Sequence, residues 1–360
     1  MPEGERRHHR SFAHRTDLLS IIAVTSALLV GFLAILFTGK DAVGGYARMI
    51  EGALGSPAAL GETSIKAAVL TCTGLSVGLA FVVGLFNIGA EGQFIAGALG
   101  AAVVGHALRL PAPLHVPLAL LSAAACGALP ALVAAWLKVR RGVHEVISTI
   151  MLNWIVIYWV QDWLVVGPLR APSSSADVSA SGTAQIQATA ELPRFFAESR
   201  LDLGLPLAVS FAVLAWFLLG RTVIGYEMRA VGANIEAARA AGIPVARRLY
   251  LAMALSGALA GISGALLILG TEHHYPGVFR TGYGFDGIAV ALVGGGHPLG
   301  VLAAAACFGA LRAGATRLQL VAIHPSFAEL IQGLAVLFVA ARGLFAALLD
   351  RAAGLLRRRA

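Results

Sequence analysis

Long apolar runs separated by short polar stretches dominate this chain of 360 residues. A helix rises about 1.5 Å per residue, so about 20 consecutive apolar residues cross the roughly 30 Å hydrocarbon core of a bilayer. Runs of this kind predict about ten membrane segments. They cover residues 18–37, 64–86, 93–108, 113–137, 145–166, 203–219, 250–270, 286–293, 299–315 and 327–345. The pattern therefore predicts an all-α, polytopic membrane protein.

The run 286–293 is too short to cross a membrane, and helix-breaking residues follow it: glycines at 294–296 and then Pro298. This order predicts a half-helix, an unwound turn and a helix over 299–315, arranged either as a re-entrant hairpin or as a pair of unequal helices. Irregular backbone at membrane depth is tolerated only where it is buried in protein or lines a cavity. We therefore expect the turn to face protein or a water-filled cavity.

Two pairs of short segments resemble each other across the chain. The string AAACGAL at 123–129 is similar to AAACFGAL at 304–311, and EVIST at 145–149 is similar to ELIQG at 329–333. The predicted topology makes the two copies run in opposite directions, which fits an inverted repeat with a substrate site where its halves meet. Alanine-rich helices also resemble each other by chance, so both interpretations stay open at this point.

The composition agrees with a membrane protein, because 58% of the residues are hydrophobic and only 13% are charged, whereas soluble domains carry about 25% charged residues. The net charge of +8 does not indicate nucleic acid, because the basic residues cluster between apolar runs. The basic stretches are 1–17, 138–141, 221–248 and 349–360. The positive-inside rule places all four in the cytosol, the loop 167–202 outside, and a single membrane domain over 18–348.

The sequence offers no catalytic or metal-binding constellation. Its three cysteines lie in apolar runs, where small buried residues are expected rather than disulfides. The pairs His8–His9 and His273–His274 lack further ligands at metal-binding spacing. No Ser/His or paired-Asp arrangement recurs at helical spacing, which speaks against an intramembrane enzyme. We therefore expect no catalytic residue and no metal.

Glu91 places a carboxylate inside the apolar stretch 84–100, with Asn87 one turn before it and Gln93 just after it. A charge at membrane depth costs roughly 2.5–3.5 kcal/mol on insertion scales unless it faces a cavity or a partner. In one interpretation Asn87 and Glu91 form a helix break that lines a pathway through the membrane or stabilises its unwound backbone. In the other, Asn87 caps a helix and Glu91 lies near the positive end of the helix dipole.

Other polar residues at membrane depth raise the same question. Asp286 either caps its half-helix, which is the favoured interpretation, or orients that half-helix toward a cavity. Ser148, Thr149 and Asn153 lie on a nearly continuous apolar helix, where they form either interhelical hydrogen bonds or contacts to a solute. The candidate pathway residues are Asn87, Glu91, Gln93, Thr149, Asn153 and Asp286.

The basic loop 221–248 contains a short predicted helix over 233–241. Asn234 can cap this helix, Gly242 can supply a left-handed C-terminal turn, and Pro244 prevents continuation. A rigid, sharply ended helix on a cytosolic loop is either a contact for a partner protein or a surface connector stabilised by its caps. The candidate contact residues are Glu227, Arg229, Asn234, Glu236, Arg239 and Gly242.

The string EMRAVGANIEAARAAGI at 227–243 resembles the coupling-helix region of ABC-transporter permeases for branched-chain amino acids, ribose-type sugars and nucleosides. Three further segments resemble the nucleoside and simple-sugar branch specifically: GLFNIGAEGQFIAGALGA at 84–101, HEVISTIMLNWI at 144–155 and the glycine-rich segment at 282–315. Together the matches cover most of residues 84–315. His144 and Trp154 stand where this branch often has Asn and Tyr, which leaves the exact substrate open.

This resemblance implies the permease subunit of an ATP-driven importer for a nucleoside or related simple sugar, in the bacterial inner (plasma) membrane with both termini cytosolic. Its expected partners are a cytosolic ATP-binding subunit, a second permease (paralogue or self), an extracytoplasmic substrate-binding lipoprotein and the lipid bilayer. The chain has no GxxxxGK[ST] loop, so ATP hydrolysis is expected on a separate subunit and no cofactor on this chain. The alternative is an ion-coupled secondary transporter in which Glu91 and Asp286 carry protons.

Overall fold

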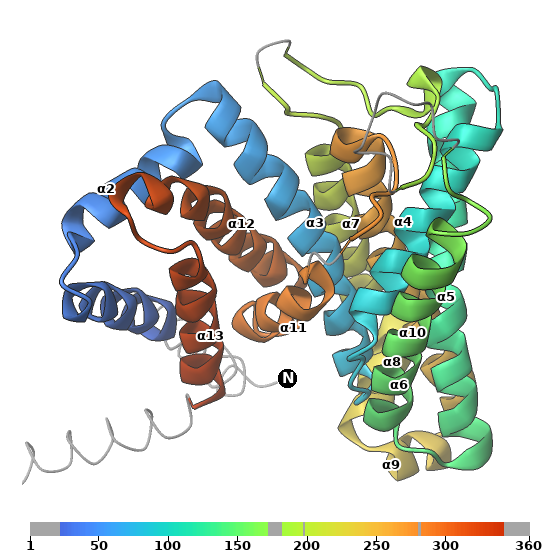
Figure 1. The fold of residues 1–360 in the computed structure, drawn as a ribbon. Helices are drawn as coiled ribbons and strands as arrows, with labels where there is room; N and C mark the ends of the chain where they lie inside the picture. Colours follow the sequence, from blue (N-terminus) through green and yellow to red (C-terminus); the bar gives the residue numbers. More distant parts are fainter. Residues whose placement is uncertain (1–21, 172–181, 197–198, 280–281, 342–360) are drawn as a thin grey trace, which may run out of the picture.

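The computed structural model of this chain describes residues 22–171, 182–196, 199–279 and 282–341. Helices make up most of them (Figure 1), which confirms the predicted all-α fold. In chain order the helices are Ile22–Phe37, α2 (Ala42–Leu54), α3 (Pro57–Val82), α4 (Ala90–Ala107), α5 (Ala112–Arg141), α6 (Glu145–Tyr158), α7 (Gly204–Arg221), α8 (Val223–Ala233), α9 (Ile235–Ala240), α10 (Val245–Leu267), α11 (Tyr283–Val293), α12 (Pro298–Gly314) and α13 (Ser326–Ala340). The predicted N-terminal stretch 1–17 and tail 349–360 lie outside the described residues.

Several helices change their hydrogen-bond pattern at the C-terminal end. α6 continues as the π-helix Trp159–Val165, α10 as the π-helix Ile268–Glu272, and α12 as the 3-10 helix Ala315–Val321. With such extensions, five helices in the described ranges are long and apolar enough to cross a membrane: Pro57–Val82, Ala112–Arg141, Gly204–Arg221, Val245–Glu272 and Pro298–Val321. The chain is therefore a polytopic membrane protein, as its apolar runs predict.

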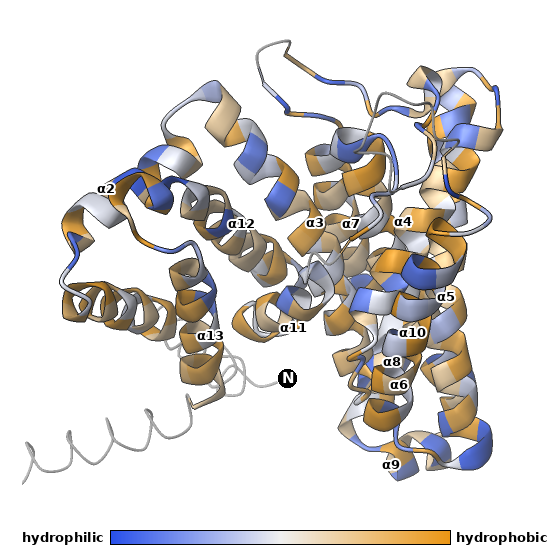
Figure 2. Cartoon of the chain, viewed as in Figure 1, coloured by the Kyte–Doolittle hydropathy of each residue, from blue (hydrophilic) through white to orange (hydrophobic). Residues whose placement is uncertain are grey.

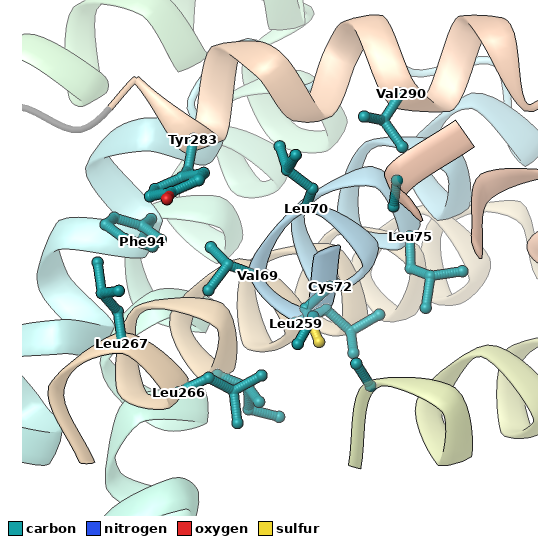
Figure 3. Close-up of a cluster of buried hydrophobic side chains, with 14 of the residues drawn as sticks. Val69, Leu70, Cys72, Leu75, Phe94, Leu259, Leu266, Leu267, Tyr283 and Val290 are labelled. Atoms are coloured by element: carbon teal, nitrogen blue, oxygen red, sulfur yellow. The ribbon is translucent and has the colours of Figure 1, made fainter. Parts of the chain in front are cut away.

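α3 and α10 form the centre of the molecule (Figure 1). In their most apolar stretches 83% and 78% of the residues are buried, against 33% in α5 and 28% in α7, so α5 and α7 lie nearer the periphery. The two central helices run antiparallel, because Ser76 contacts Ser256 and the start of α3 lies beside the end of α10. Figure 3 shows their shared core, which Phe94, Tyr283 and Val290 join from α4 and α11.

The order of packing supports the predicted inverted repeat. α3 packs mainly against α11 and α12 of the second half, while α10 packs mainly against α4 and α5 of the first half. The two glycines of the repeated strings occupy matching places: Gly127 of α5 lies against Gly257 and Gly261 of α10, and Gly309 of α12 lies against Ala67 of α3. Small residues allow these close backbone approaches. Thus α3 lies among helices of the second half, and α10 lies among helices of the first half.

The predicted half-helix is α11, which has 11 residues and begins slightly earlier than expected, at Tyr283. Two glycines in the following turn have left-handed backbone angles, Gly295 with φ 64° and Gly296 with φ 73°. The 17-residue α12 then begins at Pro298. The structure confirms the sequence of half-helix, turn and longer helix, and it shows a pair of unequal helices.

The outer surface of the bundle is apolar between two polar ends (Figure 2). α5 exposes Leu121 and Leu129, and α6 exposes Ile147, Met151 and Tyr158. Large apolar side chains on peripheral helices, with aromatic rings toward the ends, are typical of a surface that contacts lipid. One helix that the apolar pattern missed is α2, because charged and glycine residues interrupt its apolar positions.

Candidate functional site

The chain between α3 and α4 leaves the helical path at membrane depth, and a buried amide pair holds it. Asn87 donates from Nδ2 to Gln93 Oε1 at 2.8 Å and accepts at Oδ1 from Gln93 Nε2 at 3.1 Å. Asn87 Nδ2 also lies 2.8 Å from the Ser256 hydroxyl, which in turn lies 3.1 Å from the Ser76 hydroxyl. All four side chains are buried. The network ties the broken segment to both central helices.

Polar side chains of α6 satisfy the free backbone groups at the start of α4. The Ile88 N–H donates to Thr149 Oγ1 at 3.3 Å, and the Gly92 N–H donates to Asn153 Oδ1. The first N–H groups of a helix have no partner within the helix, so an acceptor from another helix stabilises them. Asn153 thus makes an interhelical hydrogen bond, as one interpretation proposed, and Thr149 bonds the segment just before α4. The Ser148 hydroxyl donates to the Glu145 carbonyl of its own helix.

Glu91 connects the two halves of the bundle. It is only 3% exposed and lies in the first turn of α4, and its carboxylate accepts hydrogen bonds from the backbone N–H groups of Gly282 at 2.9 Å and Gly284 at 2.6 Å. A carboxylate is therefore held at the positive ends of two helices, α4 and α11. Glu91 lies near the positive end of α4, as the second interpretation proposed, and it also bonds the N-terminal N–H groups of α11.

The expectation that Asn87 caps α4 is wrong. The N-cap residue is Gly89, which has no side chain to offer, and Asn87 Oδ1 instead accepts from the Gly89 N–H at 3.0 Å. The expectation that Asp286 caps α11 is also wrong. Asp286 lies in the first turn of α11, but its Oδ2 accepts from Arg312 Nη1 at 2.5 Å, and the free N–H groups at the start of α11 bond Glu91.

Arg312 and Tyr283 are the residues that the sequence reasoning missed at this site. The Arg312 guanidinium lies 4.1 Å from the centre of the Tyr283 ring, where a cation–π contact adds to the bond with Asp286. A signal for Arg312 was present, because an intramembrane carboxylate such as Asp286 calls for an opposite charge. Tyr283 had no such signal, since aromatic residues are common on apolar helices.

A cavity of about 290 Å³ opens beside Tyr283, where α3 begins and α10 ends. Its polar lining residues are Glu62, Lys66, Arg200, Thr271, Glu272, Tyr283 and Arg312. The Glu62 carboxylate pairs with Arg200 at 3.0 Å and with Lys66 at 3.8 Å. None of the predicted pathway residues lines this cavity directly. Glu91 is connected to the cavity through α11, because its carboxylate bonds the backbone on either side of the lining residue Tyr283.

The loop 221–248 lies at the end of the molecule opposite the loop 182–196 (Figure 1). α9 begins as predicted, because Asn234 Oδ1 accepts from the N–H groups of Glu236 at 2.9 Å and Ala237 at 3.0 Å. It ends before Gly242, whose φ is 79°. Within α9 only Ala238 is buried. The short helix is therefore a capped, exposed element, as the sequence predicts.

The sequence missed α8, which occupies the first part of the same loop, and the ion pair that fixes it. Glu227 of α8 accepts from Arg248 Nε of α10, and both side chains are more than four-fifths buried, at 18% and 19% exposed. Arg229 is exposed, and Glu236 pairs with Arg239 at 2.9 Å on the outer face of α9. The ion pair therefore joins α8, which precedes the exposed α9, to the central helix α10.

The structure combines paired broken helices, a buried polar network at their junction and a capped helix exposed at one end. These features are typical of a membrane transport subunit. Residues 59–340 match the family described as "Branched-chain amino acid transport system / permease component". The chain belongs to this family of transport permeases.

Three relatives resemble almost the whole chain. The guanosine ABC transporter permease protein NupP of Bacillus subtilis is 38% identical, over 90% of this chain and 92% of its own. The nucleoside ABC transporter permease protein NupB of Lactococcus lactis is 31% identical, over 94% of each chain. The glucose ABC transporter permease protein TsgB13 of Haloferax volcanii is 33% identical, over 91% and 87%.

Within the described residues, no group of three or more His, Cys, Asp or Glu side chains is placed to hold a metal ion. The three cysteines at 72, 126 and 307 are free thiols. The charged groups that the fold gathers are instead arranged as ion pairs and helix-end contacts. Such contacts join helices to one another.

Proposed function

We propose that this chain is the membrane-spanning permease subunit of an ATP-driven ABC importer that translocates a nucleoside or a related simple sugar. The observation that carries the proposal is the similarity along nearly the full length to permeases named for guanosine, nucleosides and glucose. The exposed, capped α9 adds a physical reason, because a permease driven by a separate ATPase needs a rigid contact on its cytosolic side.

The motion of the ATPase would reach the cavity through a continuous set of contacts. α9 adjoins α8, and the Glu227–Arg248 pair joins α8 to α10. Ser256 of α10 bonds Asn87, and the segment around Asn87 leads into α4. Glu91 of α4 then bonds the first residues of α11. A displacement of α9 would therefore change how the two halves meet beside the cavity.

The membrane orientation follows from charge. The basic residues 138–141 at the end of α5 and the basic loop 221–248 lie at the same end of the bundle (Figure 1). The positive-inside rule assigns this end to the cytosol, where an ATP-binding subunit would contact α9. The cavity and the loop 182–196 would then face the outside, where a substrate-binding lipoprotein would dock. Both chain termini are proposed to be cytosolic, in a bacterial plasma membrane, with ATP bound by the partner subunit.

A second permease completes the proposed assembly, as a copy of this chain or a paralogue. The helix Ile22–Phe37 and α2 expose Leu29, Leu33, Phe37, Val43 and Ile50. This apolar surface belongs to the part of the chain outside the central pair α3 and α10. This surface can contact lipid or the second permease of the proposed assembly.

Proteoliposomes that contain the permease with its ATP-binding partner test the proposal. Uptake of labelled guanosine should require ATP on the cytosolic side and the loaded binding protein outside, and a protonophore should leave it unchanged. Competition by unlabelled glucose distinguishes a sugar carrier from a nucleoside carrier. Uptake that follows a proton gradient in the absence of ATP would show the ion-coupled alternative, in which Glu91 and Asp286 carry protons.

A further inference from the structure

The cavity between the start of α3 and the end of α10 contains two polar side chains that have no partner within the part of the chain that the structure describes. Glu62 is paired with Arg200 and Lys66, and Arg312 is bonded to Asp286. In contrast, the Thr271 hydroxyl is buried and has no hydrogen-bond partner. The Glu272 carboxylate is partly exposed in the cavity and has no ion pair or hydrogen bond among the described residues. The buried Thr271 hydroxyl without a partner requires an explanation, and an absent ligand is one.

The backbone that presents these two groups is irregular. Thr271 and Glu272 end the π-helix Ile268–Glu272, and the next residue, His273, has a left-handed φ of 57°. π-Helical turns occur frequently at functional sites, and a left-handed angle at a residue other than glycine stores strain. Both Thr271 and Glu272 line the cavity.

The chemistry of the lining defines what the cavity can hold. Its volume of about 290 Å³ is at the lower limit of small-molecule sites, which span about 300–1,000 Å³. Carboxylates and cations are both present, so a neutral solute that donates and accepts hydrogen bonds suits it better than an ion. The Glu272 carboxylate offers two oxygen atoms that accept hydrogen bonds. Two neighbouring hydroxyl groups on a solute match this pair of acceptors.

We propose that this cavity binds the vicinal diol of a ribose or sugar ring, with the two hydroxyls donating to Glu272 and with Thr271 bonding one of them. An acidic side chain recognises ribose hydroxyls in the same way in dinucleotide-binding folds. This inference rests on the proposed function and assigns a solute-selecting role to the permease itself. It predicts discrimination between a ribonucleoside and its 2′-deoxy analogue, which lacks one of the two donors.

Saturation-transfer NMR on the complete transporter in lipid nanodiscs, without the binding protein, tests this assignment. The probes are guanosine, 2′-deoxyguanosine and glucose. Guanosine should give strong saturation of its ribose protons, and 2′-deoxyguanosine should bind about tenfold more weakly, because it loses a hydrogen bond to a charged group. Saturation of glucose without guanosine would assign the diol to a sugar ring, and saturation of guanosine would assign it to ribose.

Two substitutions locate the diol. Glu272→Gln should weaken guanosine binding about tenfold and remove most of the preference over 2′-deoxyguanosine, and Thr271→Val, which keeps the side-chain shape, should weaken binding less. Glu191→Gln is the matched control, because Glu191 does not line the cavity. Measurable and equal binding of guanosine and 2′-deoxyguanosine by the unaltered transporter, or unchanged binding of the saturated solute by Glu272→Gln, would overturn the proposal. Stimulation of ATP hydrolysis by the loaded binding protein is measured on the same samples. If it persists, the importer function stands although the diol site fails.

Discussion

At the scale of single residues, Glu91 joins the halves of the bundle because it replaces the missing N-terminal partners of α11. Removing its carboxylate leaves the buried N–H groups of Gly282 and Gly284 without an acceptor, at a cost of roughly 1–3 kcal/mol for each group. Glu91→Ala should therefore lower transport strongly. Glu91→Gln should be milder, because its amide oxygen still accepts hydrogen bonds.

The ranking of these two variants separates the mechanisms. Uptake of labelled nucleoside, normalised to membrane-inserted protein, is the measurement. A proton carrier requires a titratable group, so it predicts that Gln is as damaging as Ala. Uptake at the unaltered level in both variants would contradict a role for Glu91 in holding the two halves together.

Gly284 carries the same contact from the other side. A Cβ at this position would lie 2.2 Å from the Glu91 backbone nitrogen, so Gly284→Ala must displace α11 from α4. We expect a loss of about 1–3 kcal/mol in stability, together with reduced transport. Gly333→Ala in α13 is the control, because nothing lies within 4 Å of its Cβ position and alanine favours a helix over glycine by up to about 1 kcal/mol. Thermal unfolding in detergent compares the two, and an equal midpoint for both would contradict the close contact.

The sequence identified polar residues of this site but not how they pair. Asn87, Glu91 and Asn153 stand out because amides and carboxylates are rare in apolar runs, and that signal needs no structure. The partners of these residues could not be predicted, because Glu91 bonds backbone groups 191 and 193 residues away. Backbone N–H groups leave no trace in the sequence. The two cap assignments failed because both side chains have partners on other helices or segments, Asn87 with Gln93 and Ser256, and Asp286 with Arg312.

At the scale of elements, α9 depends on a left-handed residue at its end. Gly242 has φ 79°, where a side chain with a Cβ costs roughly 1–2 kcal/mol. Gly242→Val should therefore reorient the end of α9 and reduce the coupling of ATP hydrolysis to transport, and Glu236→Lys should do so by reversing an exposed charge. Binding-protein affinity should stay unchanged.

Gly142 offers a matched control for Gly242. It has φ 69°, it ends α5 in the same left-handed conformation, and nothing lies within 4 Å of its Cβ position. Gly142→Val therefore introduces the same backbone strain away from α9. ATPase activity and uptake in proteoliposomes should fall further in Gly242→Val. If the two variants behave alike, general strain explains the result and α9 has no special role.

Elements with a strong local signal were predicted, and those that depend on their neighbours were not. α9 has a side-chain cap, a left-handed glycine and a proline, all readable from the chain. The turn between α11 and α12 is marked by glycines and Pro298. The π-helical ends of α6 and α10 carry no comparable marker. They arise from packing, and with them the cavity escaped sequence-based prediction.

At the scale of the whole molecule, α10 links the two ends of the bundle. The start of α10 is joined to α8 by the Arg248–Glu227 pair, and its middle bonds Asn87 through Ser256. Its π-helical end lines the cavity. Motion of α10 would therefore displace the loop 221–248, the segment between α3 and α4, and the cavity lining. The Glu227–Arg248 pair is the contact that joins this loop to α10.

Exchanging the charges of this pair tests whether the link transmits motion. Arg248→Glu places two carboxylates together in a site where the side chains are only 18% and 19% exposed. The loss should exceed the roughly 0–1 kcal/mol of an exposed pair. ATP hydrolysis should then continue with fewer solute molecules carried per ATP. The double variant Glu227→Arg with Arg248→Glu restores opposite charges and should recover much of that ratio.

The exposed Arg48–Glu51 pair serves as control, because its exchange should change nothing. If the single variant keeps the normal ratio of transport to hydrolysis, α8 is not coupled to α10 through this pair. If the double variant recovers stability but not the ratio, the pair holds the fold and the motion takes another route.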